Sequence, residues 1–112
     1  MNLITAEELY QKLSSGEKIE VIDVRESWEY EEENIGAVNI PLYDLPKQLD
    51  KVKTYCDCEI VLHCKTGARS EKARKYLASV GINTCKSLCN GMEEFRNTYG
   101  SISAVASSNI NG

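Results

Sequence analysis

One cysteine, followed by a short segment that contains a glycine, is the part of the sequence best suited to covalent chemistry. Residues 63–70 read HCKTGARS. The apolar run before Cys64 predicts a buried strand, and the spacing after it predicts a helix, so Cys64 stands where a strand passes into a loop. Gly67 can adopt backbone angles that turn consecutive N–H groups inward. These amides and the helix dipole favour an anion at the loop's centre, which predicts a standing thiolate at Cys64.

The other side chains of this loop also suit an anionic group at its centre. Lys65 and Arg69 add positive charge, and the guanidinium of Arg69 can fork onto an anionic substrate. Ser70 can hydrogen-bond the sulfur or cap the helix. A cysteine before a glycine turn is commonly inert, but converging donors indicate a nucleophile. The predicted anion-binding loop comprises the nucleophile Cys64 together with Lys65, Thr66, Gly67, Ala68, Arg69 and Ser70.

Composition and charge indicate one small globular domain. The chain has 112 residues, 42% hydrophobic and 27% charged, with a net charge of -4 at pH 7; these are ordinary globular values, and the negative charge argues against binding nucleic acid. No apolar run approaches a membrane span, and no signal-peptide pattern opens the chain. Five cysteines, an odd number, fit free thiols in a reducing compartment. We therefore expect a cytoplasmic protein without nucleic-acid or membrane partners.

Strand patterns alternate with helix patterns along the chain. The clearest helix start is the capping box that Thr5 and Glu8 can form. Expected strands cover residues 19–24, 35–42, 59–64 and 83–88, and expected helices cover residues 5–14, 26–33, 44–53, 69–80 and 92–99. This alternation predicts an α/β fold with a mainly parallel sheet, whose active site lies at the carboxyl ends of the strands. The domain is expected to span residues 1–99, and residues 100–112 read as a mobile tail.

Three segments together resemble the rhodanese family. CKTGARS, residues 64–70, is similar to that family's active-site loop; VIDVRESWEYEEENIGAVNIPL, residues 21–42, resembles its opening block; and SLCNGMEEF, residues 87–95, resembles its closing block. The resemblance implies a five-stranded, mainly parallel sheet with helices on both faces. Glu33 and Asn34 depart from a Gly-His pair that many members have, as does Asn90 from a glycine.

The resemblance also implies a sulfurtransferase. The Cys64 thiolate would take a sulfane sulfur from thiosulfate or a protein persulfide, hold it as a persulfide, and pass it to cyanide, a thiol or a sulfur-carrier protein. No cofactor is expected, because the cysteine itself carries the sulfur. Partners would be small sulfur compounds or sulfur-relay proteins.

The length of the loop distinguishes this function from a related one. Phosphatases and arsenate reductases that use a cysteine place five residues between Cys and Arg, whereas four separate Cys64 from Arg69. A smaller ring of amides fits one sulfur atom better than a tetrahedral oxyanion. A small phosphatase or arsenate reductase is thus the less favoured alternative, and a non-catalytic, regulatory interaction module is another.

Asp23 and Arg25 follow the first expected strand, near the same rim. By resemblance they form an ion pair in the wall of the site, and direct substrate contact is the minority reading. His63 should point away from the loop, since neighbours on a strand face opposite sides; we expect a structural histidine. Trp28 and Tyr30 read as packing residues of a short helix.

Glu29 and residues 31–33 form an acidic run that reads as a solvated helix face. Its alternative role is docking to a basic partner.

The remaining cysteines are Cys56, Cys58, Cys85 and Cys89. Cys85 and Cys89 stand about 13 Å apart on one strand at ~3.3 Å per residue, too far to share a tetrahedral ion, so no metal site is expected. By family topology Cys89 neighbours Cys64, which makes it a candidate resolving thiol.

The protein context has two readings. Rhodanese modules also occur behind adenylating enzymes that activate sulfur carriers, and residues 34–36 resemble some of those. Met1 and the early helix favour a free-standing protein, and the absence of excess apolar patches favours a monomer.

Overall fold

A computed structural model describes residues 2–55 and 57–105. Within these residues, five strands form one sheet in the order β1-β5-β4-β2-β3. The strands are β1 (Leu3–Ile4), β2 (Ile19–Asp23), β3 (Val38–Asn39), β4 (Glu59–His63) and β5 (Cys85–Leu88). Every pair of neighbouring strands is parallel. The predicted α/β fold with a five-stranded parallel sheet is therefore confirmed.

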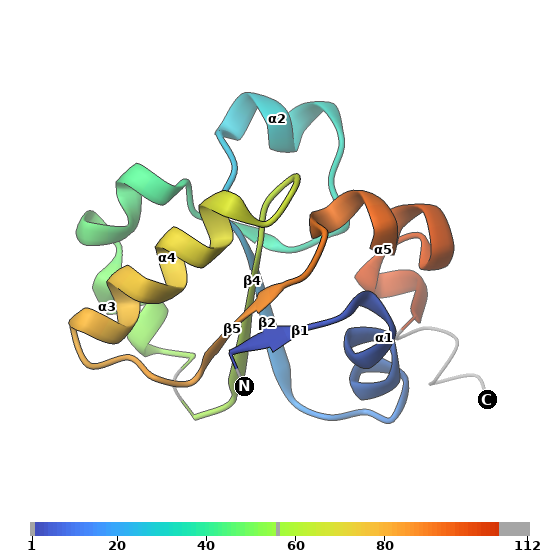
Figure 1. Cartoon of the computed structure of the whole chain (residues 1–112), viewed down its shortest axis with the longest axis horizontal. Helices are drawn as coiled ribbons and strands as arrows, with labels where there is room; N and C mark the ends of the chain where they lie inside the picture. Colours follow the sequence, from blue (N-terminus) through green and yellow to red (C-terminus); the bar gives the residue numbers. More distant parts are fainter. Residues whose placement is uncertain (1, 56, 106–112) are drawn as a thin grey trace.

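Helices cover both faces of the sheet (Figure 1). They are α1 (Ala6–Ser14), α2 (Ser27–Glu32), the 3-10 helix η1 (Leu42–Lys47), α3 (Leu49–Lys53), α4 (Ala68–Ser79) and α5 (Gly91–Tyr99). Helices α3 and α4 lie on one face, and α1 and α5 lie on the other. Helix α2 covers neither face; it lies beyond the edge of the sheet at which β4 passes into α4.

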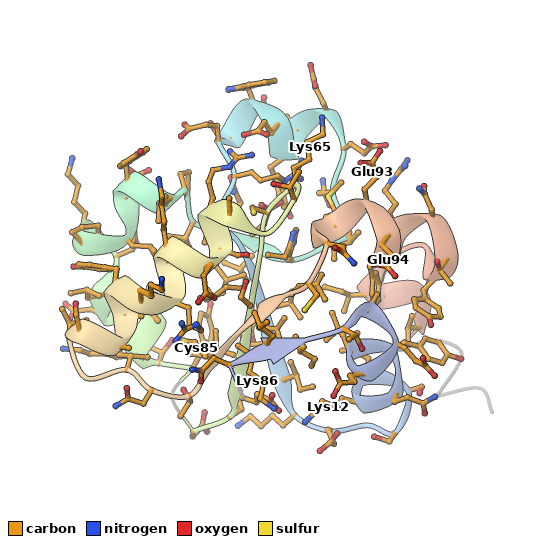
Figure 2. The ribbon with its side chains drawn as sticks, viewed as in Figure 1. Lys12, Lys65, Cys85, Lys86, Glu93 and Glu94 are labelled. Carbon is orange, nitrogen blue, oxygen red and sulfur yellow. The ribbon has the colours of Figure 1, made fainter. Side chains whose placement is uncertain are left out.

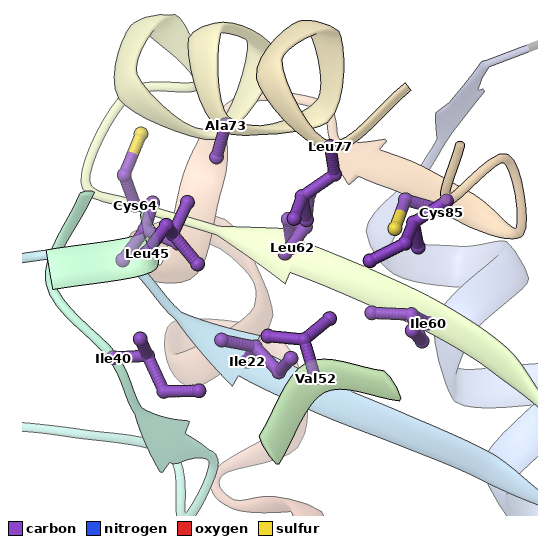
Figure 3. Close-up of a cluster of buried hydrophobic side chains, with 12 residues drawn as sticks. Ile22, Ile40, Leu45, Val52, Ile60, Leu62, Cys64, Ala73, Leu77 and Cys85 are labelled. Carbon is purple, nitrogen blue, oxygen red and sulfur yellow. The ribbon is translucent and has the colours of Figure 1, made fainter. Parts of the chain in front are cut away.

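Two hydrophobic cores result from the alternation of side chains along the central strands. Ile60 and Leu62 of β4 point into the core beneath α4, whereas Val61 points into the core beneath α5. Each such side chain contributes about 1.5–3 kcal/mol when fully buried. Cys64 continues this alternation and closes the first core beside the start of α4 (Figure 3). Because β4 is the central strand of the sheet, the loop after Cys64 begins at the middle of the row of carboxyl strand ends.

The start of α1 is as predicted. The Glu8 N–H donates to Thr5 Oγ1 at 3.0 Å, and the Thr5 N–H donates to Glu8 Oε1 at 3.0 Å. This reciprocal pair is the capping box expected from the sequence.

The single helix predicted over residues 44–53 is wrong. The segment divides into η1 and α3, with Gln48 between them at φ -114° and ψ 18°. Pro46 lacks an N–H and disfavours α geometry in the residue before it, so the chain takes tighter 3-10 turns there. Leu45 and Val52 are nevertheless buried, and both belong to the core beneath α4.

The two outer strands of the sheet, β1 and β3, also differ from the sequence prediction. Strand β3 is limited to two residues of the range predicted over 35–42, and the two-residue β1 was absent from the prediction. Ile35 lies before β3 and packs in the core beneath α5. Strands this short carry too little periodicity to be recognised from sequence.

The described part of the predicted tail packs against the domain. Residues 102–105 are helical. The Ile102 N–H donates to the Ile35 carbonyl at 2.8 Å, and Val105 is buried. Residues 106–112 lie outside the described residues, and so does Cys56. Over the described ranges, no helix has the length and apolar character needed to cross a membrane.

Candidate active site

The Cys64 sulfur lies inside the loop between β4 and α4. Cys64 is 1% exposed. The Gly67 N–H donates to Cys64 Sγ at 3.0 Å, and the Ser70 N–H donates to it at 3.4 Å. Gly67 has φ 108°, a left-handed conformation that favours glycine and that aims its N–H at the sulfur. Two amides at the start of a helix thus surround the sulfur, an arrangement that stabilises negative charge on it.

Ser70 and Ser87 form a buried hydroxyl pair under the sulfur. Ser70 Oγ lies 3.7 Å from Cys64 Sγ and donates to the Gly67 carbonyl at 3.0 Å. Ser87 Oγ, from β5, lies 2.6 Å from Ser70 Oγ. Either hydroxyl can donate in this pair. Ser87 therefore helps to hold the hydroxyl nearest the sulfur in place.

The turn between β5 and α5 supports the loop from below. The Met92 N–H donates to the Cys64 carbonyl at 2.9 Å. Gly91, with φ 71°, lies so close that a Cβ atom there would stand 2.0 Å from the Lys65 carbonyl oxygen. Asn90 also has a positive φ, 59°, which asparagine tolerates better than most residues. The departure of Asn90 from the family's glycine thus preserves the turn.

The two terminal nitrogens of Arg69 are paired with the carboxylate of Glu29. Its Nη1 lies 2.6 Å from Glu29 Oε1, and its Nη2 lies 3.0 Å from Glu29 Oε2. The bidentate pairing lowers the pKa of the Glu29 carboxyl to about 2 and raises the pKa of Arg69. The fork that the sequence assigns to an anionic substrate is already occupied by a carboxylate.

Asp23 and Arg25 form the expected ion pair in the wall of the site. Both residues are buried, and Arg25 Nη2 lies 2.8 Å from Asp23 Oδ2. Arg25 Nη2 also donates to the Glu33 carbonyl at 2.7 Å. Arg25 thus holds the end of α2 from one side, and Arg69 holds Glu29 of the same helix from the other.

A pocket of about 160 Å³ lies between α2, the loop and the start of α5. Lys65 and Glu93 line it from the loop and from α5 (Figure 2). Its full lining is Arg25, Trp28, Glu29, Glu32, Glu33, Lys65, Met92 and Glu93. The pocket gives a small molecule or an extended segment a place beside the loop, and carboxylates form much of its wall.

His63 is structural, as the sequence predicts. It is buried on the face of β4 opposite Cys64, and its Nε2 lies 3.8 Å from Asp23 Oδ2. Neither ring nitrogen has a hydrogen-bond partner among the described residues. Burial lowers the pKa of His63 to about 4. The ring is therefore neutral at pH 7 and does not act as a base for the thiol.

His63 should make the domain less stable in mild acid. Because the folded protein holds His63 neutral and the unfolded chain protonates it near 6.5, its contribution is complete above 6.5 and is lost as the pH falls toward 4. We expect the free energy of unfolding in urea to fall by about 2 kcal/mol between pH 7 and pH 5. A His63→Gln variant should lose most of this dependence; an unchanged slope would assign it to other groups.

The remaining predicted site residues divide into two groups. Lys65, Thr66 and Ala68 are exposed on the loop, and Lys65 alone of these lines the pocket. Cys89 is half-buried at the end of β5, and its N–H donates to the Ile4 carbonyl.

The other described cysteines lie away from the loop. Cys85 is buried in the core beneath α4, and the Cys58 thiol donates to the Tyr55 carbonyl. Over residues 2–55 and 57–105, no three histidine, cysteine or acidic side chains are grouped to hold a metal ion.

Sequence reasoning missed two residues and misjudged a third. Glu29 reads as part of a solvated run, yet its side chain is 13% exposed and faces the loop. Ser87 is a polar residue at a buried strand position, which is the only signal the sequence offers for it. Trp28, which we expected to be a packing residue, is 61% exposed and lines the pocket. Tyr30 is half-buried, and its hydroxyl donates to the Ala37 carbonyl, which fits the expected packing role.

Comparisons with known proteins agree on one family. A family model described as "Rhodanese-like domain" matches residues 5–98. The chain is 33% identical over 93 residues to the putative sulfur carrier protein YrkF of Bacillus subtilis, covering 82% of this chain and 49% of that protein. It is 35% identical over 82 residues to the putative sulfurtransferase YtwF of the same organism, covering 72% of this chain and 78% of that protein. The chain thus spans about half of YrkF.

Solved structures share the fold. The crystal structure of a rhodanese-like domain protein from Staphylococcus aureus superimposes with a TM-score of 0.76 at 29% identity, covering 85% of this chain and 91% of that one.

Proposed function

The chain belongs to the family of rhodanese-like domains, and from that premise we propose that it is a sulfurtransferase in which Cys64 carries the sulfur as a persulfide. The observation that carries the proposal is the placement of Cys64 Sγ within reach of the Gly67 and Ser70 amides. These donors stabilise a thiolate before the reaction and the same charge on a persulfide after it. No other residue is required to carry the sulfur.

The proposed reaction has two half-reactions. In the first, the Cys64 thiolate attacks the outer sulfur of a donor, a bond forms between Sγ and that sulfur, and the donor departs with the electrons of the broken bond. Thiosulfate would release sulfite, and a persulfide would release a thiolate. In the second, cyanide, a thiol or the activated end of a sulfur-carrier protein attacks the outer sulfur, and Cys64 leaves as a thiolate. The enzyme alternates between two forms, so ping-pong kinetics should follow.

Arg69 supports this function over the phosphatase alternative. A phosphatase of this kind needs its loop arginine on the phosphate oxygens, whereas Arg69 is paired with Glu29 through both terminal nitrogens. The site therefore favours transfer of a single atom over transfer of a group with three oxygens.

The test is an intact mass measured after incubation with thiosulfate or with a persulfide, and again after cyanide. We expect the protein to gain one sulfur atom and to lose it to cyanide. Failure to gain sulfur from either donor would make a non-catalytic interaction module the better explanation.

We propose a sulfur-relay context for this domain, in the cytoplasm and as a monomer. The name of YrkF as a sulfur carrier and that of YtwF as a sulfurtransferase support such a context. The donor or acceptor would then be another protein of the relay.

Cys89 is proposed as a thiol that can resolve the persulfide. Leu62 and Ser87 are paired in β4 and β5, so Cys64 and Cys89 lie two residues further along adjacent strands. A Cβ atom placed on Gly67 would also lie 3.7 Å from the Leu88 carbonyl oxygen and 3.9 Å from the Asn90 nitrogen, so the loop lies beside the residues that flank Cys89. The Cys89 thiolate would attack Cys64 Sγ, form a disulfide with it and expel hydrosulfide.

In a Cys89→Ser variant, sulfur loading should be unchanged, but the loaded protein should release hydrosulfide several-fold more slowly in the absence of an acceptor. Hydrosulfide release and peptide mass mapping of the disulfide measure the two products. Equal release rates in the two proteins would rule out this role.

A further inference from the structure

We propose that Glu29 determines the donor: by occupying the Arg69 fork it disfavours oxyanion donors such as thiosulfate and leaves the site suited to an alkyl persulfide. This inference rests on the proposed sulfurtransferase function and narrows it. It concerns the first half-reaction only.

Both arginines of the site are committed to carboxylates of the chain itself. Arg69 forms two hydrogen bonds with Glu29, at 2.6 and 3.0 Å. Arg25 forms hydrogen bonds with both oxygens of Asp23 and with the Glu33 carbonyl. Because Nη1 and Nη2 of Arg69 are both bonded to Glu29, the end-on fork of this guanidinium is not open to an oxyanion. An incoming sulfonate group would have to displace Glu29 to obtain it.

Glu29 does not yield its place readily. Its pKa is about 2, so the carboxylate stays ionised at any pH at which the enzyme is assayed. The Glu26 N–H also donates to Glu29 Oε1 at 3.0 Å, and this contact orients the side chain from within α2. The carboxylate is thus fixed from two sides.

The charge of the pocket acts in the same direction. Glu29, Glu32, Glu33 and Glu93 line it, against Arg25 and Lys65. Arg25 is paired with Asp23, and Glu29 and Glu33 are paired with Arg69 and Arg96. Among the described residues, Lys65 is the one cation of the lining that forms no ion pair, and the lining also holds the carboxylates of Glu32 and Glu93. A dianionic donor would find only Lys65 as an unpaired cation in this lining and would be repelled by the carboxylates around it.

The two donors differ most in the group that departs. Thiosulfate transfers its outer sulfur to Cys64 Sγ and releases sulfite, whose two negative charges lie on three oxygens and require cationic donors. An alkyl hydropersulfide, RSSH, transfers its outer sulfur with the proton and releases one thiolate, RS⁻. Total charge at the loop is three negative charges with thiosulfate and one with RSSH, and the amides of Gly67 and Ser70 suffice for the latter.

The experiment compares second-order rate constants for sulfur loading with two donors, and intact mass is used to measure the loading. The donors are thiosulfate and the hydropersulfide of 2-mercaptoethanol, whose hydroxyethyl group carries no charge. In a Glu29→Gln variant, the ratio of the thiosulfate rate to the hydropersulfide rate should rise about tenfold or more, because Arg69 becomes free to bind sulfonate oxygens. The hydropersulfide rate is the internal reference of this ratio, because this donor brings no sulfonate oxygens for Arg69 to bind.

Two further variants separate fork occupancy from net charge. Glu31→Gln removes the same charge from an exposed position of α2 outside the pocket, and its ratio should match wild type. Glu29→Asp keeps the charge but shortens the reach, and its ratio should rise. It also serves if Glu29→Gln does not fold. A rise in Glu31→Gln equal to that in Glu29→Gln would overturn the inference, as would wild-type ratios in both Glu29 variants.

The outcomes also separate this inference from the function on which it rests. Loading of the wild type by neither donor would refute the sulfurtransferase function itself. Loading by both donors, with a ratio that Glu29 does not alter, would leave that function intact and refute only the role of Glu29.

Discussion

Replacement of Cys64 by serine should abolish sulfur loading, with a loss of at least about 1000-fold in the rate constant. A hydroxyl at this position is not ionised near neutral pH, and His63, the only histidine of the chain, faces away from the loop and cannot activate it. The Gly67 and Ser70 amides can stabilise an anion but cannot create a nucleophile. Intact mass with either donor measures the effect.

The matched control is Cys58→Ser, because Cys58 is a half-buried free thiol on a different loop. It should load one sulfur atom at the wild-type rate. Circular dichroism should show that the Cys64→Ser variant is folded, since serine retains the size of the side chain. A variant that is folded and still loads sulfur would show that another thiol is the carrier.

Replacement of Gly91 by alanine should disrupt both stability and activity. The new Cβ would lie 2.0 Å from the Lys65 carbonyl oxygen and 2.7 Å from the Cys64 carbonyl oxygen. These are backbone atoms of the loop itself, so no side-chain rotation relieves the overlap. We expect a loss of about 3 kcal/mol or more in the free energy of unfolding. Sulfur loading by the folded fraction should fall at least tenfold, because the loop is displaced.

Gly81→Ala is the control for backbone strain alone. Gly81 has φ 93°, and an added Cβ would meet nothing within 4 Å. It should cost only about 1–2 kcal/mol for the left-handed conformation, with normal sulfur loading. Urea unfolding and loading rates on both variants test the prediction. If the two variants lose the same stability and Gly91→Ala keeps full activity, the close approach of Gly91 to the loop is not required.

The positions of Cys64 and Gly91 explain how the site is assembled. Cys64 follows the central strand, and Gly91 starts the helix after the neighbouring strand. The Met92 N–H donates to the Cys64 carbonyl because the segment after β5 comes close to the loop after β4 at Gly91. The loop thus keeps its shape through backbone contacts with Gly91 and Met92 of a distant segment.

Local sequence predicted most of the elements and placed Cys64 at the end of a buried strand. The capping box at Thr5, the apolar run of β4 and the helical spacing after Gly67 depend on neighbouring residues, and the structure agrees with each. Propensity failed where one residue changed the geometry, as at Pro46, or where a strand such as β1 was too short to show a period. The resemblance to the rhodanese family supplied the strand count that local patterns did not.

Only the tertiary structure decided what the charged side chains near Cys64 do. Glu29 and Arg69 are separated by 40 residues, and nothing in either neighbourhood signals that they meet. The sequence therefore assigned Arg69 to a substrate and Glu29 to solvent, whereas the packing of α2 over the loop pairs them. Ser87 reaches Ser70 for the same reason, through the alignment of β5 beside β4. Residue types and local spacing determine which groups can react, but long-range packing determines which of them are already paired.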